Sequence, residues 1–372
     1  MRKIFINADI YTHEQVIPHG YIDTVNGKIE TIGRMDQVDL SDHEELIDIT
    51  NHNLSAGWMD LQVNGIGNTL FENVTNGDGI EEIGTLLRQQ GTTSWFGALT
   101  SVPSTKFNQI KHVVQTTVGK FGFSGVHVEG PWINPDFKGG HPSERIKASS
   151  EAHVEFVRAV SLYCPVIATV APEIIPYNEL QDLLSMSNVT VLAGHTDCSW
   201  VKSSPPAIHG CTHLFNGMPP LSSRMPHALG WLIGNRSRMA SIIADGRHLQ
   251  RETIQVLKRA CWPDQVFLVS DIMPSDAIVT DGIDCLEDVM LDKTDSLVTK
   301  TGTIGGANSS IQAGLKFMVQ KVGVPMASAI NMVTTVPAAL VGREQRLLMA
   351  GHGTDLVSFD NQFNVKETHQ LN

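Results

Sequence analysis

Histidine and acidic residues recur at the ends of short apolar segments of this chain. His127 and Glu129 end one such segment, and Gly130-Pro131 follows directly. In an extended strand, side chains two positions apart lie on the same face, so these two point the same way. Later apolar segments end in the same residue types, at His195, His213, Asp245, His248 and Asp271. The pattern predicts one metal-binding site assembled from several strand ends.

Glu129, His195 and His213 offer a carboxylate and two imidazoles from three different strands. Three nitrogen or oxygen ligands with one open position are typical of a catalytic zinc site. Zinc lowers the pKa of its bound water to about 7, which supplies hydroxide at neutral pH. Asp271, at the end of the eighth predicted strand, is the candidate proton shuttle. Singly, such residues are more often hydrogen-bonded caps than ligands, but together they favour a metal site.

Three further residues are candidates for substrate contacts. His141 lies in the glycine-rich segment Lys138-Gly-Gly-His141, where a histidine could polarise a carbonyl group. The alternative interpretation is a solvated loop histidine. Arg224 and His248 are candidate anion-binding groups, because arginine recognises phosphate through two parallel hydrogen bonds. Alone, Arg224 would rank as a surface charge.

The composition indicates the class of protein. The 372 residues are 41% hydrophobic and 18% charged, as in soluble globular enzymes. A net charge of −12 argues against nucleic acid and anionic membranes as partners, so an anionic substrate would need a local cluster of cations. The five cysteines are scattered without a C-x-x-C spacing, which indicates reduced thiols. Because the chain also lacks a signal segment and a membrane-spanning stretch, we expect a soluble, cytoplasmic protein.

Apolar strands alternate with helical segments from about Leu54 onward. About eight strands are expected, which is the number a (β/α)₈ barrel requires. They lie near Trp58–Val63, Thr92–Leu99, Gly125–Glu129, Val166–Val170, Val189–Ala193, Ala207–Leu214, Met239–Ala244 and Val266–Ser270. The plausible helices between them include Gly79–Gln90, Ser150–Val160, Asn178–Met186 and Gln250–Arg259. Such alternation predicts parallel pairing in an α/β TIM barrel, whose active site lies at the carboxyl ends of the strands.

Both ends of the chain are predicted to be β-rich. Residues 1–53 contain short β-prone segments, and Asn26-Gly27 is a strong hairpin signal. After a long helical stretch over Ser309–Val341, the chain becomes extended again. Because this tail is too short to fold alone, we expect it to complete the N-terminal sheet. The predicted organisation is a small discontinuous domain, residues 1–53 and 342–372, beside a catalytic barrel of residues 54–341.

Several spaced motifs carry a family resemblance. They are WMDLQVNG at 58–65, HVEGPWIN at 127–134, KGGH at 138–141, GHT at 194–196, THLFNGM at 212–218, ADGRH at 244–248 and SD at 270–271. In this order they resemble the N-acetylglucosamine-6-phosphate deacetylases of the amidohydrolase superfamily. The resemblance runs from about Leu54 to Val341 and implies that the flanking segments form the family's small β-sandwich domain.

The resemblance implies a role for each candidate. Glu129, His195 and His213 would bind the metal, Asp271 would act as general base and then acid, and His141 would polarise the acetyl carbonyl. The sugar and its phosphate would be contacted by Asn216, the Gly217 backbone, Arg224, His248, Ile304, Gly305 and Gly306. In relatives some phosphate contacts come from the neighbouring subunit, so a homodimer with active sites at or near its interface is implied.

The chain departs from the superfamily at the first strand, where Asp60-Leu61-Gln62 replaces the usual His-x-His ligands of a second metal. Gln62 is a poor ligand, so we expect one divalent metal per subunit, and a two-metal site with Asp60 and Gln62 as the remnant of the second position is the less favoured alternative. The ligands suit zinc, and iron, manganese or cobalt are alternatives.

The substrate's epimer stays open, because Gly217 and the segment 222–227 differ from relatives near the sugar. N-acetylglucosamine 6-phosphate is the expected substrate, and N-acetylgalactosamine 6-phosphate is the alternative. More distant alternatives are another amidohydrolase and a non-catalytic sugar-phosphate binder. A non-catalytic binder would be expected to lack a metal ligand or the proton-shuttle acid. All of these residues are present in the sequence.

Overall fold

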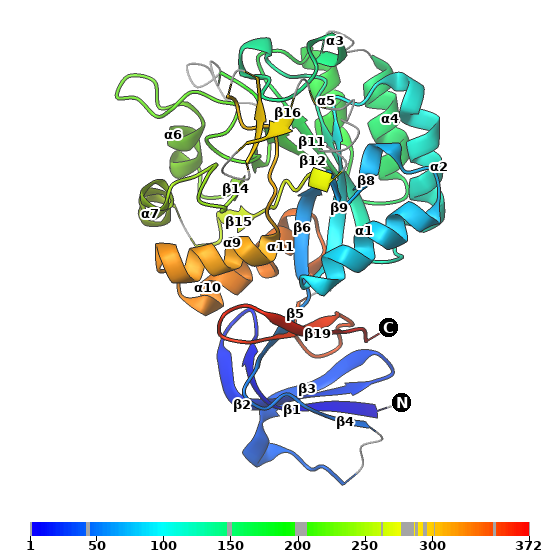
Figure 1. Cartoon of the computed structure of the whole chain (residues 1–372), viewed down its shortest axis with the longest axis vertical. Helices are drawn as coiled ribbons and strands as arrows, with labels where there is room; N and C mark the ends of the chain where they lie inside the picture. The colour runs from blue at the N-terminus through cyan, green and yellow to red at the C-terminus, as the bar shows by residue number, and fades with distance from the viewer. Residues whose placement is uncertain are drawn as a thin grey trace.

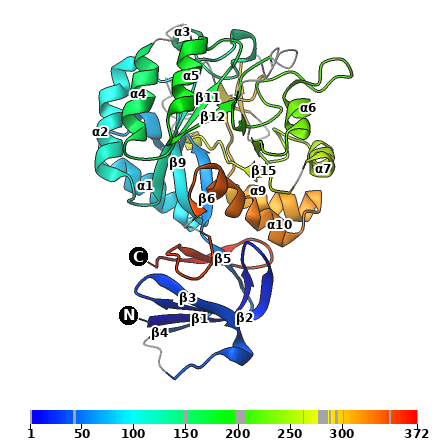
Figure 2. The same ribbon diagram turned by 180° about the vertical axis from the view of Figure 1, so that it is seen from behind.

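A barrel and a smaller sheet make up the molecule (Figure 1). The computed structural model describes residues 2–41, 45–146, 151–197, 207–261, 263–276, 286, 289–292, 296–300, 302–344 and 347–371. Helices surround the barrel strands in both views, and the small sheet with both chain termini lies at one end of the barrel (Figures 1 and 2). Strand β6 begins beside this sheet and runs away from it, so the carboxyl ends of the barrel strands lie at the far end.

The predicted eight-stranded barrel is confirmed. Its strands are β6 (Trp58–Val63), β9 (Thr92–Thr100), β10 (Phe123–Glu129), β11 (Val166–Val170), β12 (Val189–Ala193), β13 (Gly210–Cys211), β14 (Met239–Ile242) and β15 (Val266–Leu268). Neighbours in this order pair in parallel. Beyond β15, the Asp271 N–H donates to the Gln62 carbonyl and the Asn64 N–H to the Ile272 carbonyl, both at 3.0 Å. These bonds join the last strand to the first.

One strand is much shorter than the sequence predicts. The expected range Ala207–Leu214 contains β13 over only Gly210–Cys211, so this prediction is wrong at both ends. The strand ends at Cys211, and His213, two residues later, has a φ of +26°. The turn after this short strand places the His213 side chain at the carboxyl end of the barrel.

Helices pack outside the strands through apolar faces. They are α1 (Gly77–Gln89), α2 (Phe107–Thr117), α3 (Ser143–Ile146), α4 (Glu151–Ser161), α5 (Tyr177–Ser185), α6 (His227–Gly234), α7 (Arg251–Ala260), α9 (Ile311–Phe317), α10 (Met326–Asn331) and α11 (Thr335–Leu340). Helix α1 buries Ile80, Ile83 and Leu87, whose spacing places them on one face. Asn76 caps this helix by accepting a hydrogen bond from the Asp78 N–H. The four predicted helices correspond to α1, α4, α5 and α7.

The expected long helical stretch over Ser309–Val341 is instead divided. Helix α9 continues into a π-helical turn over Met318–Val322, and α10 and α11 follow separately. Gly323 adopts a left-handed φ of +78°, and Pro325 precedes α10. A left-handed glycine ends one helix and a proline starts the next, so a continuous helix is excluded here.

The small sheet joins both ends of the chain. Its seven strands are β1 (Arg2–Tyr11), β2 (Val16–Val25), β3 (Lys28–Arg34), β4 (Glu45–Asp48), β5 (Asn53–Ala56), β18 (Leu356–Phe359) and β19 (Val365–His369). Asn26 and Gly27 both have positive φ in the hairpin between β2 and β3, as predicted. Strand β18 pairs with β5, so the C-terminal tail does complete the N-terminal sheet. We propose Gly57, between β5 and β6, as the junction of the two domains.

Among the described residues, Cys164, Cys211 and Cys261 form no disulfide, whereas Cys198 and Cys285 lie outside the described residues. Within the same described ranges, no helix has the length and apolar character needed to cross a bilayer.

The close approach of β13 to β14 gives a testable prediction. A Cβ atom on Gly210 would lie 1.7 Å from the backbone carbonyl oxygen of Met239. Gly210→Ala should therefore lower the free energy of unfolding by about 1–3 kcal/mol or more, measured by urea denaturation. The control is Gly234→Ala at the end of α6, where a Cβ would meet nothing within 4 Å. It should leave stability unchanged or raise it by up to ~1 kcal/mol. Wild-type stability in the Gly210 variant would contradict this strand register.

Candidate metal centre and active site

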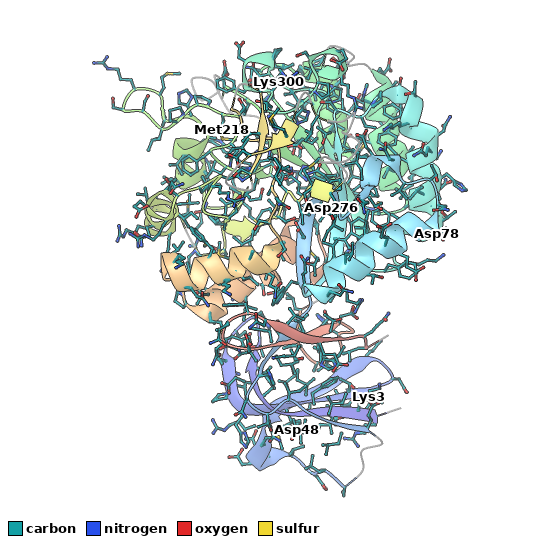
Figure 3. The ribbon with its side chains drawn as sticks, in the orientation of Figure 1. Lys3, Asp48, Asp78, Met218, Asp276 and Lys300 are labelled. Carbon is teal, nitrogen blue, oxygen red and sulfur yellow. The ribbon has the colours of Figure 1, made fainter. Side chains whose placement is uncertain are left out.

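A cavity of about 700 Å³ opens at the carboxyl ends of the barrel strands. Its lining includes most of the predicted site residues, namely Glu129, His141, His195, His213, Asn216, Gly217, His248, Asp271, Ile304, Gly305 and Gly306. Arg224, Asp60 and Gln62 are absent from this lining. The hairpin of β16 (Val289–Leu291) and β17 (Leu297–Thr299) brings further residues to the mouth. Among them is Lys300, which lies at the same end of the barrel as Met218 (Figure 3).

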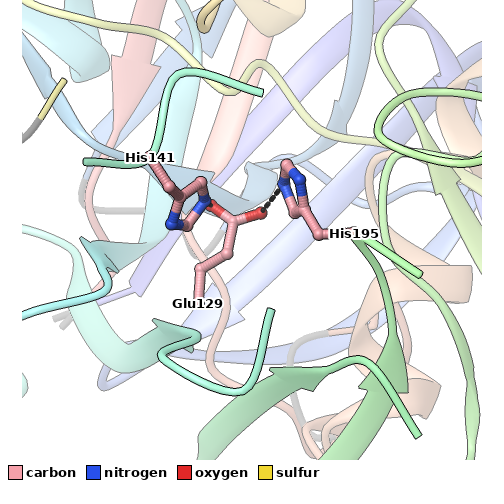
Figure 4. Close-up of side chains that lie close together, drawn as sticks. All are labelled: Glu129, His141 and His195. Atoms are coloured by element: carbon pink, nitrogen blue, oxygen red, sulfur yellow. Dashed lines mark hydrogen bonds and ion pairs between the residues drawn. The ribbon is translucent and has the colours of Figure 1, made fainter. Parts of the chain in front are cut away.

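Glu129, at the end of β10, is the centre of a buried histidine cluster. Its Oε1 lies 2.8 Å from His213 Nε2 and 3.2 Å from His195 Nε2. Its Oε2 lies 3.7 Å from His141 Nε2, on the opposite side (Figure 4). The ligand atoms of Glu129, His141 and His195 all lie within 4.8 Å of one another. Burial alone would raise the pKa of Glu129, but its contacts with the three histidines hold that pKa well below its ordinary value.

The orientation of His195 tests whether a metal ion fits this cluster. His195 Nδ1 lies 2.7 Å from the Phe137 carbonyl oxygen, which can only accept a hydrogen bond, so Nδ1 carries the hydrogen. In a neutral ring, Nε2 then presents a lone pair to the Glu129 carboxylate. A metal cation or a proton between these two atoms, 3.2 Å apart, would turn their repulsion into attraction. A carboxylate with two imidazole nitrogens fits a divalent transition metal, and zinc suits this set.

Asp271 lies beside this cluster, after β15. Its Oδ1 accepts hydrogen bonds from Asn64 Nδ2 at 2.7 Å and from Gln62 Nε2 at 3.1 Å. Burial, followed by the negative charge of Glu129, raises the pKa of Asp271 to about 6. A carboxyl group that titrates near neutral pH can both accept and return a proton.

Gln62 connects the two carboxylates instead of facing a second ion. Its Nε2 lies 3.3 Å from Glu129 Oε2 and also donates to Asp271, while its Oε1 accepts from Thr212 Oγ1 at 3.3 Å. The amide oxygen, the only metal-binding atom of this side chain, therefore points away from the cluster. Asp60 lies deeper, and its Oδ1 accepts from the backbone N–H groups of Gln62 and Ser270. Burial raises the pKa of Asp60 to about 7.

His141 is not the solvated loop histidine of the alternative interpretation. Its side chain is buried, and its Nδ1 lies 2.7 Å from the Ser101 hydroxyl. Burial lowers the pKa of His141 to about 4, which keeps the ring neutral. Lys138 Nζ donates to the His141 carbonyl at 3.0 Å, and Arg145 pairs with the buried Glu72. The loop that carries His141 is thus held from both sides.

His127 shows the limit of the spacing argument. Its Nδ1 donates to the Leu61 carbonyl at 3.0 Å, and its Nε2 accepts from the Thr169 hydroxyl at 2.7 Å. Both ring nitrogens of His127 are hydrogen-bonded within the barrel. His127 therefore does not line the cavity.

The predicted substrate contacts divide into two groups. His248 Nδ1 lies 2.7 Å from Asp245 Oδ2, which leaves Nε2 for a ligand in the cavity. Asn216 Nδ2 donates to the His213 carbonyl at 3.1 Å, and Gly217 has a φ of +58°. Arg224 is exposed, in the segment before α6 that projects from the barrel (Figure 1). The structure therefore does not bring Arg224 to the cavity of its own chain.

Sequence reasoning missed several residues that the structure places at or beside the site. Ser101 contacts His141, Asn64 contacts Asp271, and Glu173 contacts the loop that follows His195. Asn64 lies inside a quoted motif, but nothing in the local sequence marks Ser101 or Glu173. Lys300 follows a short β segment without a distinctive pattern.

Comparisons with known proteins support the family resemblance. No protein-family model matches the chain. The human N-acetylglucosamine-6-phosphate deacetylase is 27% identical over 337 residues, 85% of this chain and 81% of that protein. The Haemophilus influenzae enzyme of the same name is 25% identical, with 93% and 92% covered. An N-acetylgalactosamine-6-phosphate deacetylase from Escherichia coli O157:H7 is 28% identical, with 75% and 76% covered.

Solved structures agree on the fold. The N-acetylglucosamine-6-phosphate deacetylase of Pasteurella multocida matches with a TM-score of 0.87 at 24% identity, covering 100% of this chain and 98% of that one. That of Mycobacterium smegmatis, an Asp-to-Ala mutant in complex with N-acetyl-D-glucosamine-6-phosphate, has the same TM-score and coverage at 19% identity. In sequence over most of its length and in fold throughout, the chain is thus similar to the amino-sugar 6-phosphate deacetylases, which confirms the resemblance that its motifs predicted.

Proposed function

We propose that this protein removes the N-acetyl group of N-acetylglucosamine 6-phosphate, giving glucosamine 6-phosphate and acetate. The observation that carries the proposal is the convergence of Glu129, His195 and His213 in one cavity with Asp271 beside them. This arrangement suits hydrolysis of an amide, and the relatives described above are named for that reaction on phosphosugars.

The side chains divide the chemistry among them. A divalent metal held by Glu129, His195 and His213 would supply Lewis acidity and a water molecule of lowered pKa. Asp271 accepts the proton of the attacking water and then donates it to the departing amine. Neutral His141 donates a hydrogen bond to the acetyl oxygen as negative charge develops there. We assign His213 to the metal because its Nε2 approaches the same Glu129 oxygen as His195, whereas His141 approaches the other oxygen.

One metal per subunit is the favoured stoichiometry. Gln62 directs its amide hydrogens toward both carboxylates, and its oxygen is occupied by Thr212. Asp60 Oδ1 is occupied by the backbone N–H groups of Gln62 and Ser270. Zinc is the proposed ion, with iron, manganese or cobalt as substitutes.

The phosphosugar would lie between the metal cluster and the cavity mouth. His248, Asn216 and the Gly217 backbone are the proposed phosphate contacts, and Ile304, Gly305 and Gly306 would line the sugar. Arg224 would complete the phosphate site from a neighbouring subunit, because it does not line the cavity of its own chain. We therefore propose a homodimer with active sites near its interface. The reduced cysteines and the substrate class favour a cytoplasmic location.

The galacto epimer is the second candidate substrate, because a relative of comparable identity is named for it. The deciding assay measures acetate release from N-acetylglucosamine 6-phosphate and from N-acetylgalactosamine 6-phosphate. The metal content of the same protein sample is determined in parallel. We expect turnover of the gluco epimer with about one metal ion per chain. Faster turnover of the galacto epimer would select the alternative, and ligand binding without acetate release would end the proposal.

Asp271→Asn tests the proton shuttle. The amide cannot carry the proton, so kcat should fall by about 10²–10⁴-fold, while metal content and thermal stability stay near wild type. Asp264→Asn is the matched control, since Asp264 is exposed and lies outside the cavity lining. Activity of the Asp271 variant within a few-fold of the control would exclude this role.

Arg224→Ala tests the contact across subunits. Losing a charge-assisted phosphate contact worth about 1.5–3 kcal/mol should lower kcat/KM for the phosphorylated sugar by roughly 10- to 100-fold. The unphosphorylated sugar should be unaffected. The control is Arg259→Ala on α7, an exposed arginine remote from the cavity lining.

Subunit mixing then separates a contact within one chain from a contact across two. Arg224→Ala and Asp271→Asn subunits, exchanged one to one, should recover roughly a quarter of wild-type kcat/KM, since each mixed dimer has one complete site. If the mixed sample recovers no kcat/KM, Arg224 either contacts the phosphate bound by its own chain or makes no phosphate contact.

A further inference from the structure

Glu173 follows β11 and accepts hydrogen bonds from two neighbouring strand-end loops. Its Oε1 accepts from Asn134 Nδ2 and from the Asp197 backbone N–H, both at 2.9 Å. Its Oε2 accepts from the Thr196 hydroxyl at 2.5 Å. Glu173 does not line the cavity, so it has no direct contact with a ligand there.

The bonded groups adjoin the proposed metal ligands. Thr196 and Asp197 directly follow His195, and Asn134 belongs to the loop that continues from Glu129. Two backbone bonds tighten the same assembly. The Asn134 N–H donates to the His195 carbonyl at 2.9 Å, and the Thr196 N–H donates to the Gly217 carbonyl at 3.0 Å. The carboxylate thus ties the loops after β10, β11 and β12 together around His195.

His195 needs such support because its backbone is strained. Its φ of +49° lies in the left-handed region, which costs a side-chain-bearing residue free energy and persists only when neighbours hold it. Apart from its contact with Glu129, the ring is held by one bond, from Nδ1 to the Phe137 carbonyl, and that carbonyl lies in the loop that contains Asn134. Release of the loops would let both the His195 backbone and its ring partner move away from Glu129.

We propose that Glu173 is a positioning residue, whose carboxylate fixes His195 in the geometry that binds the metal. The inference rests on the proposed function in taking Glu129, His195 and His213 as the metal ligands. It extends that function to a side chain that touches neither the metal site nor the substrate cavity. Groups that orient ligands in this way commonly affect metal affinity as much as activity.

Glu173→Gln tests the inference by replacing one acceptor oxygen with an amide donor of the same shape. The negative charge is then lost, and all three contacts persist only if the Thr196 hydroxyl changes from donor to acceptor. The zinc dissociation constant, measured by chelator competition without substrate, should rise by about 10- to 100-fold. Glu179→Gln is the matched control. Glu179 accepts from Trp132 Nε1 at 2.6 Å, in the same loop as Asn134, but bonds nothing beside His195. The zinc dissociation constant of the Glu179→Gln variant should stay within about threefold of the wild-type value.

A double-mutant cycle with His195→Ala separates positioning from general loosening. If Glu173 acts through His195, Glu173→Gln should weaken zinc binding no further in the His195→Ala background. An equal loss in both backgrounds, or an equal loss in Glu179→Gln, would overturn the inference, and so would wild-type affinity in Glu173→Gln. Wild-type protein that binds no zinc, iron, manganese or cobalt would overturn the proposed metal centre itself, which is a different result.

Discussion

The buried carboxylate of Glu129 is the constraint on which the rest of the site depends. Its side chain is buried, with three histidine rings directed toward its two oxygens. A buried charge is costly unless an opposite charge compensates it. The Nδ1 hydrogen of His195 is committed to the Phe137 carbonyl, so Nε2 is the ring atom that faces the carboxylate. A cation bound between Glu129 and these imidazoles would compensate the buried charge, which is the arrangement proposed above.

Backbone strain at the strand ends is the second requirement. His195, His213 and Asp271 all adopt positive φ, between +26° and +52°, where residues with side chains are rarely found. Each follows a barrel strand, and the sharp turn points its side chain into the mouth instead of along the barrel wall. The strands supply a rigid base for these turns, since their apolar side chains fill the barrel and its helical shell. The packed core thus keeps the strained residues in place at the cavity mouth.

Sequence reasoning reached the barrel and the metal cluster because both depend on local patterns. Strands and helices alternate visibly, and a parallel barrel brings all strand ends to one face, so residues such as Glu129 and His213 must converge. The failures have a different origin. The break at Gly323 and Pro325 lies inside an apolar stretch that otherwise has a helical pattern, and the short β13 precedes the turn at His213. Ser101 and Glu173 could not be placed, because their partners lie in loops whose paths the sequence pattern does not fix.

Gln62 shows how one side chain can change what a barrel mouth holds. A histidine at this strand position would present a lone pair toward the cluster and favour a second cation. The amide instead presents two N–H donors, one to Glu129 and one to Asp271, while Thr212 occupies its oxygen. It thereby bridges two carboxylates that would otherwise repel each other, a task that a second metal ion would also perform. In the proposed one-metal arrangement, Asp271 would not ligate a second ion, so its carboxylate would stay available for protons, and its pKa of about 6 suits that use. A glutamine at this position would then both withhold a metal ligand and leave free the acid on which the proposed hydrolysis depends.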